Sequence, residues 1–197
     1  NLGSEIVIYL LAKVLPIETA GKVYLTAFGM LFILSIFYFM NSIDSRKRVL
    51  GFFGFLFFYN WYFHQGYLNF YGSLPFYFFA LGLWHRSASL ASFRDKATLG
   101  ALFVTIFFFH LISWLALVGS IIVLTLWEAG NRKKLVNTAA TLVPSLLLVI
   151  NYFVFLRGGS STHMGVQFLN PYENMTFAVT HTFVDFSKWD ILLYVVP

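Results

Sequence analysis

Apolar residues run along this chain in long stretches that are separated by short polar or basic breaks. The stretches cover approximately residues 23–41, 49–63, 70–84, 97–127 and 135–156, and a further one begins at 191. A helix needs roughly 20 apolar residues to cross the core of a bilayer, so stretches of this length are typical of membrane-spanning helices. The pattern predicts an all-α fold, a polytopic bundle of transmembrane helices.

The longest apolar stretch, residues 97–127, is predicted to form two helices. A single helix over these residues would be about 46 Å long, well beyond the roughly 30 Å hydrocarbon core. Arg94 and Lys96 precede the stretch, and basic residues 132–134 follow it. A hairpin puts both basic groups on one side of the membrane, as the positive-inside rule prefers. We expect the hairpin to turn near His110–Ser113.

The N-terminal apolar segment, residues 4–15, is too short to cross a membrane. Lys13 and Pro16 limit it. Two interpretations stay open: a short helix at the interface or on the outer side of the bundle, or the tail of a span that begins before Asn1.

The whole chain is predicted to be one transmembrane domain, residues 1–197, with about six to seven spans. It begins at Asn1 and stops at Pro197 inside an apolar run, so we expect a fragment of a longer chain. The one extended polar loop, residues 157–190, is predicted to lie on the exoplasmic side.

Basic residues divide unequally between the two faces of this topology. Nine of the 13 fall on one face: Arg46, Lys47, Arg48, Arg86, Arg94, Lys96, Arg132, Lys133 and Lys134. The positive-inside rule makes that face cytoplasmic, and we expect the bacterial inner (plasma) membrane. The net charge of +5 does not predict nucleic-acid binding, because the basic residues lie in short clusters between the apolar stretches.

Composition agrees with a lipid environment. Charged residues make up 11% of the chain, against about 25% in a typical soluble domain. Hydrophobic residues make up 59% and aromatic residues 21%, and there is no cysteine, so disulfides are excluded.

The densest polar cluster lies between the second and third apolar stretches. It contains Asn60, His64, Gln65 and Asn69, among several aromatic residues. Polar side chains at membrane depth are costly and are candidates for function, here the binding of sugar hydroxyls or phosphate. The alternative is an interfacial loop with an ordinary aromatic belt.

Other polar residues are candidates for chemistry on the same outer face. His110 lies deep in an apolar stretch and could bind phosphate or act as a general base, or it could only hydrogen-bond a neighbouring helix. Glu173 and Asp185 lie in the large loop and are catalytic candidates that could serve as a base or a metal ligand, although loop carboxylates are commonly solvated. No His-x-x-x-His or Glu-x-x-His spacing occurs, so no metal site is predicted.

Three motifs carry a resemblance to a known superfamily. Asn60 to Arg86 resembles a stretch of poorly characterised bacterial multi-span proteins, in which Gly-x-x-Asn (here Gly66 to Asn69) begins a span that ends in basic residues. A hairpin with a histidine at its turn, like Phe109-His110-Leu111, often follows, and Leu11 to Ala20 is similar as well. These proteins are similar to the GT-C superfamily of membrane glycosyltransferases, which use polyprenyl-phosphate sugar donors.

The resemblance covers roughly residues 5–156 and implies a fold and an activity. The activity would be sugar transfer from the lipid-phosphate donor on the exoplasmic face, at a site lined by Asn60, His64, Gln65, Asn69 and His110. In that superfamily a catalytic acid normally lies in the first large outward loop, and no such acidic loop occurs in this window. A non-catalytic accessory or scaffold subunit, bound to other membrane subunits, is therefore a second hypothesis. A transporter or lipid flippase is a third, although few charges lie within the spans.

Overall fold

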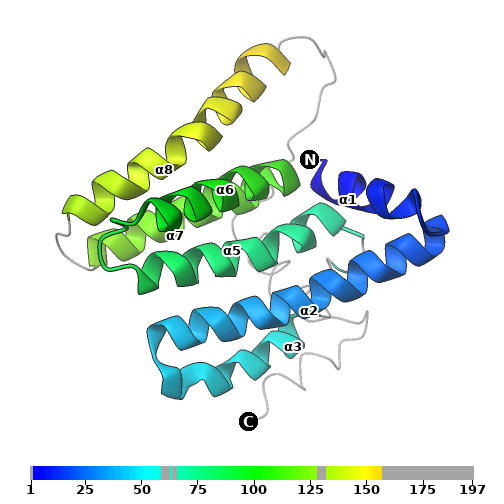
Figure 1. Ribbon diagram of the computed structural model, residues 1–197, viewed down its shortest axis with the longest axis horizontal. Coiled ribbons are helices and arrows are strands. Elements are labelled where there is room, and N and C mark those ends of the chain that lie inside the picture. The colour runs from blue at the N-terminus through cyan, green and yellow to red at the C-terminus, as the bar shows by residue number, and fades with distance from the viewer. Residues whose placement is uncertain (1, 59–62, 64–65, 128–131, 157–197) are drawn as a thin grey trace, which may run out of the picture.

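The computed structural model describes residues 2–58, 63, 66–127 and 132–156, and in these residues it is helical without any strand (Figure 1). The predicted all-α class is confirmed. The α-helices are α1 (Gly3–Ala12), α2 (Ile17–Ile43), α3 (Phe53–Phe58), α5 (Leu68–Arg86), α6 (Phe93–Phe109), α7 (Leu111–Trp127) and α8 (Arg132–Asn151). A 3₁₀ helix, η1 (Ser45–Phe52), joins α2 to α3, and a π-helical turn, η2 (Tyr152–Leu156), extends α8.

The long helices lie side by side and alternate in direction along the chain (Figure 1). The chain runs leftward in α2, back through η1 and α3, and leftward again in α5; α6, α7 and α8 continue the alternation. α2 and α5 therefore run parallel, and Nδ1 of His85 near the end of α5 lies 3.1 Å from the Ser42 carbonyl near the end of α2. α5 packs against α2 on one side and against α6 and α7 on the other, while α8 packs on α6.

The α6–α7 hairpin reverses the chain at a single residue. His110 is extended, with φ −159° and ψ 114°, between two helices of 17 residues each. Its N–H closes α6 by a 2.7 Å bond to the Ile106 carbonyl, and its carbonyl accepts the Trp114 N–H at 3.1 Å. The predicted break of residues 97–127 into two helices near His110 is confirmed.

The apolar stretch at 49–63 differs from the continuous span that its hydropathy predicts. Its first residues belong to η1, and α3 follows with six described residues. Gly51 lies in η1 and explains part of this difference, because glycine disfavours the α-helix. Gly51 and Gly54 also let the backbone lie directly against Phe37 and Ile36 of α2.

Two helices of the described chain are long and apolar enough to cross a bilayer. They are α2, with 27 residues, and α8 with the start of η2, with 23 residues. α6 and α7 are each about 26 Å long, shorter than the roughly 30 Å core. Helix length alone therefore does not establish the predicted six to seven spans.

α8 buries one stripe of polar residues and exposes many of its apolar ones. The buried residues Lys134, Thr138, Thr141 and Ser145 recur every three or four positions and so form one stripe. Six large apolar residues of the helix are exposed: Leu135, Val136, Val143, Leu146, Leu147 and Ile150. A surface helix of a soluble protein has the opposite arrangement, with an apolar stripe toward the core.

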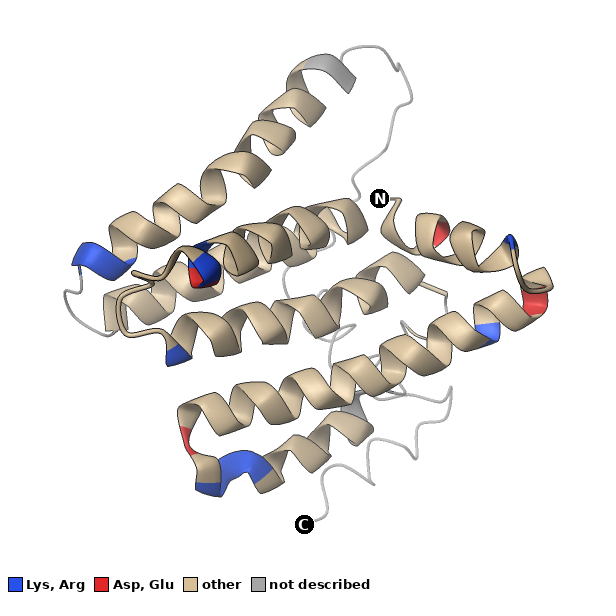
Figure 2. Cartoon of the chain, in the orientation of Figure 1, with Lys and Arg blue, Asp and Glu red and all other residues tan. Residues whose placement is uncertain are grey.

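One end of the bundle is basic. Figure 2 shows Lys and Arg gathered at the left, where α2 and α5 end and where α6 and α8 begin. Buried contacts join these helix ends: the Lys134 ammonium lies 3.6 Å from the centre of the Trp84 ring, and the Trp84 indole N–H donates to Thr138 Oγ1 at 3.0 Å. We refer to this as the basic end of the bundle.

Candidate functional site

A pocket lies at the end of the bundle opposite the basic end, where α1, the start of α5 and the α6–α7 turn meet. Its volume is about 320 Å³, and it is lined by Ser4, Glu5, Ile8, Gly66, Tyr67, Leu68, Asn69, Phe70 and His110. The lining combines a carboxylate, an amide and an imidazole with apolar and aromatic walls. Such a mixture is typical of a ligand site, in which a few polar groups orient the ligand.

Asn69 fixes the carboxylate of Glu5 in this pocket. Leu2 precedes α1 and offers no side-chain cap, so the first-turn N–H groups need acceptors from elsewhere. Asn69 Oδ1 accepts the Ser4 N–H at 2.8 Å, and Asn69 Nδ2 donates to both Glu5 oxygens at 2.9 and 3.0 Å. The Ser4 N–H is a donor and the Glu5 carboxylate is an acceptor, so the oxygen of the Asn69 amide must face Ser4 and its nitrogen must face Glu5. One side chain of α5 therefore caps α1 and positions its acid.

Tyr24 of α2 ties α1 and α5 together beneath the pocket. Its hydroxyl lies 2.6 Å from Ser4 Oγ and 3.3 Å from the Leu68 carbonyl. The carbonyl can only accept, so Tyr24 donates to Leu68 and Ser4 donates to Tyr24. Tyr24 and Ser4 are both buried. This hydrogen-bonded chain holds three helices in register.

Two glycines allow this close approach. A Cβ at Gly3 or at Gly72 would lie 2.5 Å from the ring of Phe109 at the end of α6. The Phe109 ring thus packs directly on the backbones of α1 and α5 and fills the space between these two helices. A larger side chain at Gly3 would push α1 away from Phe109, and one at Gly72 would displace Phe109 or Tyr24.

A chain of buried hydroxyls sets the tautomer of His110. Ser73 Oγ lies 2.5 Å from the Phe70 carbonyl and 2.7 Å from Ser113 Oγ, and Ser73 is the donor in both contacts. The Ser113 hydroxyl therefore keeps its own proton to donate to His110 Nδ1, at 3.2 Å. The Ser113 N–H also donates to Nδ1, at 3.4 Å. Nδ1 is thus the acceptor of the ring, and Nε2 carries the proton.

Partial burial also keeps His110 neutral. It lowers the pKa of His110 below its ordinary value of 6.5, since burial disfavours the charged form. At neutral pH the neutral imidazole can therefore donate a hydrogen bond from Nε2.

The structure brings together two of the residues predicted from the sequence, Asn69 and His110, in one pocket. The remaining candidates lie outside the described residues: Asn60, His64, Gln65, Glu173 and Asp185. In the part of the chain that the structure describes, no three His, Asp or Glu side chains gather closely enough to hold a metal ion.

Sequence reasoning missed Ser4, Glu5 and Tyr24 as site residues. Glu5 falls on the same outer face as His110 by topology, yet nothing in the spacing of the sequence joins it to Asn69. One signal was available: α1 begins without a capping residue of its own, so a partner from another segment had to supply the acceptor.

Comparison with known proteins gives no match. No family model, no curated protein and no solved structure is similar enough to this chain to assign it to a family. A functional proposal for this chain therefore rests on the chemistry of the pocket and the polarity of the helices.

Proposed function

We propose that this chain is part of a polytopic membrane glycosyltransferase similar to the GT-C superfamily, and that the pocket is its transfer site. The sugar would come from a polyprenyl-phosphate donor on the exoplasmic face. The observation that carries the proposal is the Glu5 carboxylate, held by Asn69 in a pocket with His110.

The outward-facing apolar surface supports membrane placement. α8 points its Ser and Thr residues at the bundle and its Leu, Ile and Val residues outward. Small polar residues commonly line helix–helix contacts in membranes, whereas lipid surrounds the apolar face. α2 likewise exposes Met30 and Leu34. In this placement α5, α6 and α7 also cross the bilayer, which local thinning allows for short helices.

The charge distribution supports an orientation. The basic end lies opposite the pocket, so the positive-inside rule favours an orientation with the basic end in the cytoplasm and the pocket outside. This is the side on which a lipid-linked donor would be consumed. We propose the bacterial inner membrane as the location.

Glu5 is the proposed general base of the transfer. The acceptor hydroxyl oxygen bonds to the anomeric carbon of the sugar while the bond from that carbon to the phosphate oxygen breaks. The hydroxyl proton goes to the Glu5 carboxylate, and polyprenyl phosphate leaves. His110 orients the acceptor by donating a hydrogen bond from Nε2 to one of its oxygens. A positioned base of this kind typically contributes about 10²–10⁴ in rate.

Donor turnover tests the proposal. The full-length protein in nanodiscs would be given radiolabelled polyprenyl-phosphate sugars, and release of labelled sugar to acceptor lipid or glycan would be measured. Glu5→Gln should lower turnover about 10²-fold or more. Glu18→Gln removes a carboxylate from the first turn of α2 instead and should leave turnover unchanged. Full activity of Glu5→Gln would show that Glu5 is not the general base.

An accessory subunit is the competing function, and the exposed apolar surface favours it equally. A subunit of a larger membrane assembly would show no turnover with any donor. It would also co-purify with other membrane proteins at a fixed ratio. These two results together would replace the glycosyltransferase proposal.

A further inference from the structure

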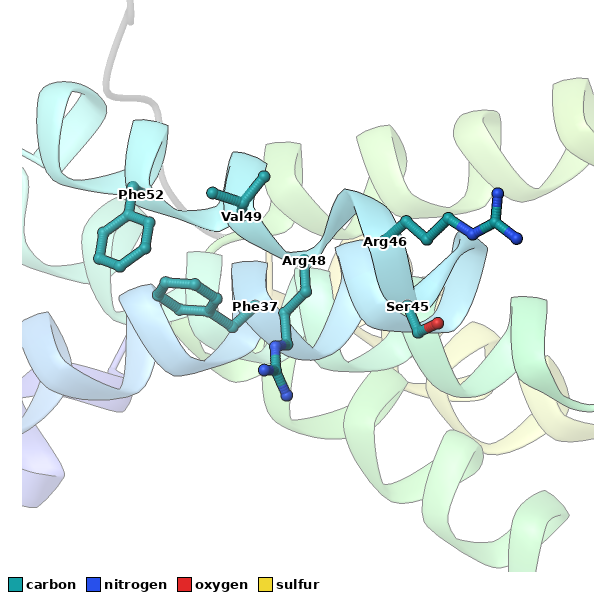
Figure 3. A pocket seen from close by; sticks show the side chains of 6 residues that line it. All are labelled: Phe37, Ser45, Arg46, Arg48, Val49 and Phe52. Carbon is teal, nitrogen blue, oxygen red and sulfur yellow. The ribbon is translucent and has the colours of Figure 1, made fainter.

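A second hollow lies at the basic end, between η1 and the last turns of α2. Its volume is about 400 Å³, and it is lined by Phe37, Ser45, Arg46, Arg48, Val49 and Phe52 (Figure 3). The proposed sugar transfer uses none of these residues. The hollow and the transfer pocket lie at opposite ends of the bundle.

The turn after α2 creates the hollow. Asp44 is extended and ends α2, and its carboxylate accepts the Arg46 N–H at 2.9 Å, which starts η1. The chain then returns along α2, where a Cβ at Gly51 would lie only 2.5 Å from the Phe37 ring. The backbone of η1 is thereby fixed against α2.

One half of the hollow is cationic. Ser45, Arg46 and Arg48 are all exposed at the end of the bundle that already carries most of the basic residues. In Figure 3 the two arginine side chains extend to either side of Ser45, and Arg48 runs past Phe37. A guanidinium group offers paired donors that match phosphate oxygens, and a serine hydroxyl adds another donor.

The other half is apolar and opens outward. The rings of Phe37 and Phe52 meet edge to face with centroids 5.1 Å apart. Val49 and Phe52 are each 62% exposed, and Phe53 and Phe55 extend the exposed apolar surface beyond them. A ligand that matches both halves has an anionic head and an apolar tail.

We propose that this hollow binds an anionic phospholipid of the cytoplasmic leaflet. Arg46, Arg48 and Ser45 would hold the phosphodiester, and one acyl chain would lie along Val49 and Phe52. The inference rests on the proposed membrane placement, but not on the proposed sugar transfer. Charge complementarity selects phosphatidylglycerol over zwitterionic phosphatidylcholine.

Lipid retention measured by native mass spectrometry tests this site. The full-length protein would be released from nanodiscs of equal phosphatidylglycerol and phosphatidylcholine, and the retained lipids counted. Wild type should retain phosphatidylglycerol selectively. R46A/R48A should weaken retention roughly 25-fold, because each basic residue at a membrane surface contributes about fivefold in affinity. The matched control R94A/K96A removes the same charge from the start of α6 and should retain the lipid.

Two further variants separate the possible explanations. Phe52→Ala removes only an apolar contact with the acyl chain. It should therefore weaken phospholipid retention without changing how far inorganic phosphate displaces the lipid. E5Q should retain lipid like wild type, whatever happens to donor turnover. Equal loss in R94A/K96A, equal retention of the two lipids, or full displacement by inorganic phosphate would overturn the proposal. Circular dichroism of each variant confirms that the helices are intact.

Discussion

At the scale of single residues, two buried tryptophans differ in what holds them. Trp84 donates its indole N–H to Thr138 and carries the Lys134 ammonium over its ring. Trp114 is also buried, yet its indole N–H has no hydrogen-bond partner among the described residues. The first side chain therefore joins α5 to α8, whereas the second mainly fills space.

Replacing each tryptophan by phenylalanine should separate these roles. Trp84→Phe loses a hydrogen bond and leaves Thr138 without its donor, at a cost of about 1–3 kcal/mol. Trp114→Phe relieves an unsatisfied N–H and should cost less, chiefly through lost volume. Thermal unfolding of both variants in the same detergent checks the order. A lower melting temperature for Trp114→Phe than for Trp84→Phe would contradict the predicted order.

The contact of Gly72 with Phe109 predicts a second pair of variants. Gly72→Ala brings a methyl group against Phe109 and the Tyr24 hydroxyl, and should destabilise the fold by about 1–3 kcal/mol. Gly119 in α7 has nothing within 4 Å of its Cβ position. Gly119→Ala should therefore be neutral or stabilise by up to about 1 kcal/mol. Unfolding midpoints of the two variants test the sign of each effect.

Only some of the site could be predicted at this scale. Asn69 and His110 stood out because each is a polar residue in an apolar stretch. The role of Glu5 depends on a contact with a residue 64 positions away, and no local pattern reports such a neighbour. The direction of the Ser73–Ser113–His110 chain likewise depends on distances that hydropathy does not contain.

At the scale of elements, the polarity of α8 predicts how it responds to charge. Val143 lies near the middle of the apolar segment 132–154, and Val136 lies one turn from its basic start. In a bilayer, Val143→Lys should cost about 2.5–3.5 kcal/mol, whereas Val136→Lys can extend its ammonium to the interface at little cost. Both valines are exposed, so in water neither substitution would change the free energy of unfolding much. Unfolding in nanodiscs measures the difference.

Periodicity and hydropathy located most helices. The breaks around residues 44–48, 86–96 and 128–134 are marked by charge, and α2, α5 and α8 follow from them. The hairpin at His110 carries no Gly or Pro. It could still be located, because residues 97–127 are too long for one span and basic residues flank both ends of the stretch. Residues 49–58 were predicted less well, because hydropathy cannot distinguish an α-helix from a 3₁₀ helix that glycines bring close to its neighbour.

At the scale of the whole molecule, the separation of the basic end from the pocket predicts topology. The chain contains no cysteine, so single cysteines can report on each end. Ser92→Cys lies at the basic end and Thr19→Cys lies at the pocket end, and both positions are exposed. In intact cells stripped of their wall, a membrane-impermeant maleimide should label Thr19→Cys but not Ser92→Cys. Labelling of Ser92→Cys alone would invert the orientation, and labelling of both would contradict a membrane-spanning bundle.

The way in which α1 is held determines when the pocket is complete. This ten-residue helix carries Glu5, but its start depends on Asn69, on Tyr24 through Ser4, and on the Phe108 carbonyl that accepts the Leu2 N–H. Those few bonds can break together while the long helices stay packed. The Glu5 carboxylate and the His110 imidazole therefore line one pocket only while this short helix is docked, and undocking it would separate the two groups while the bundle stays folded.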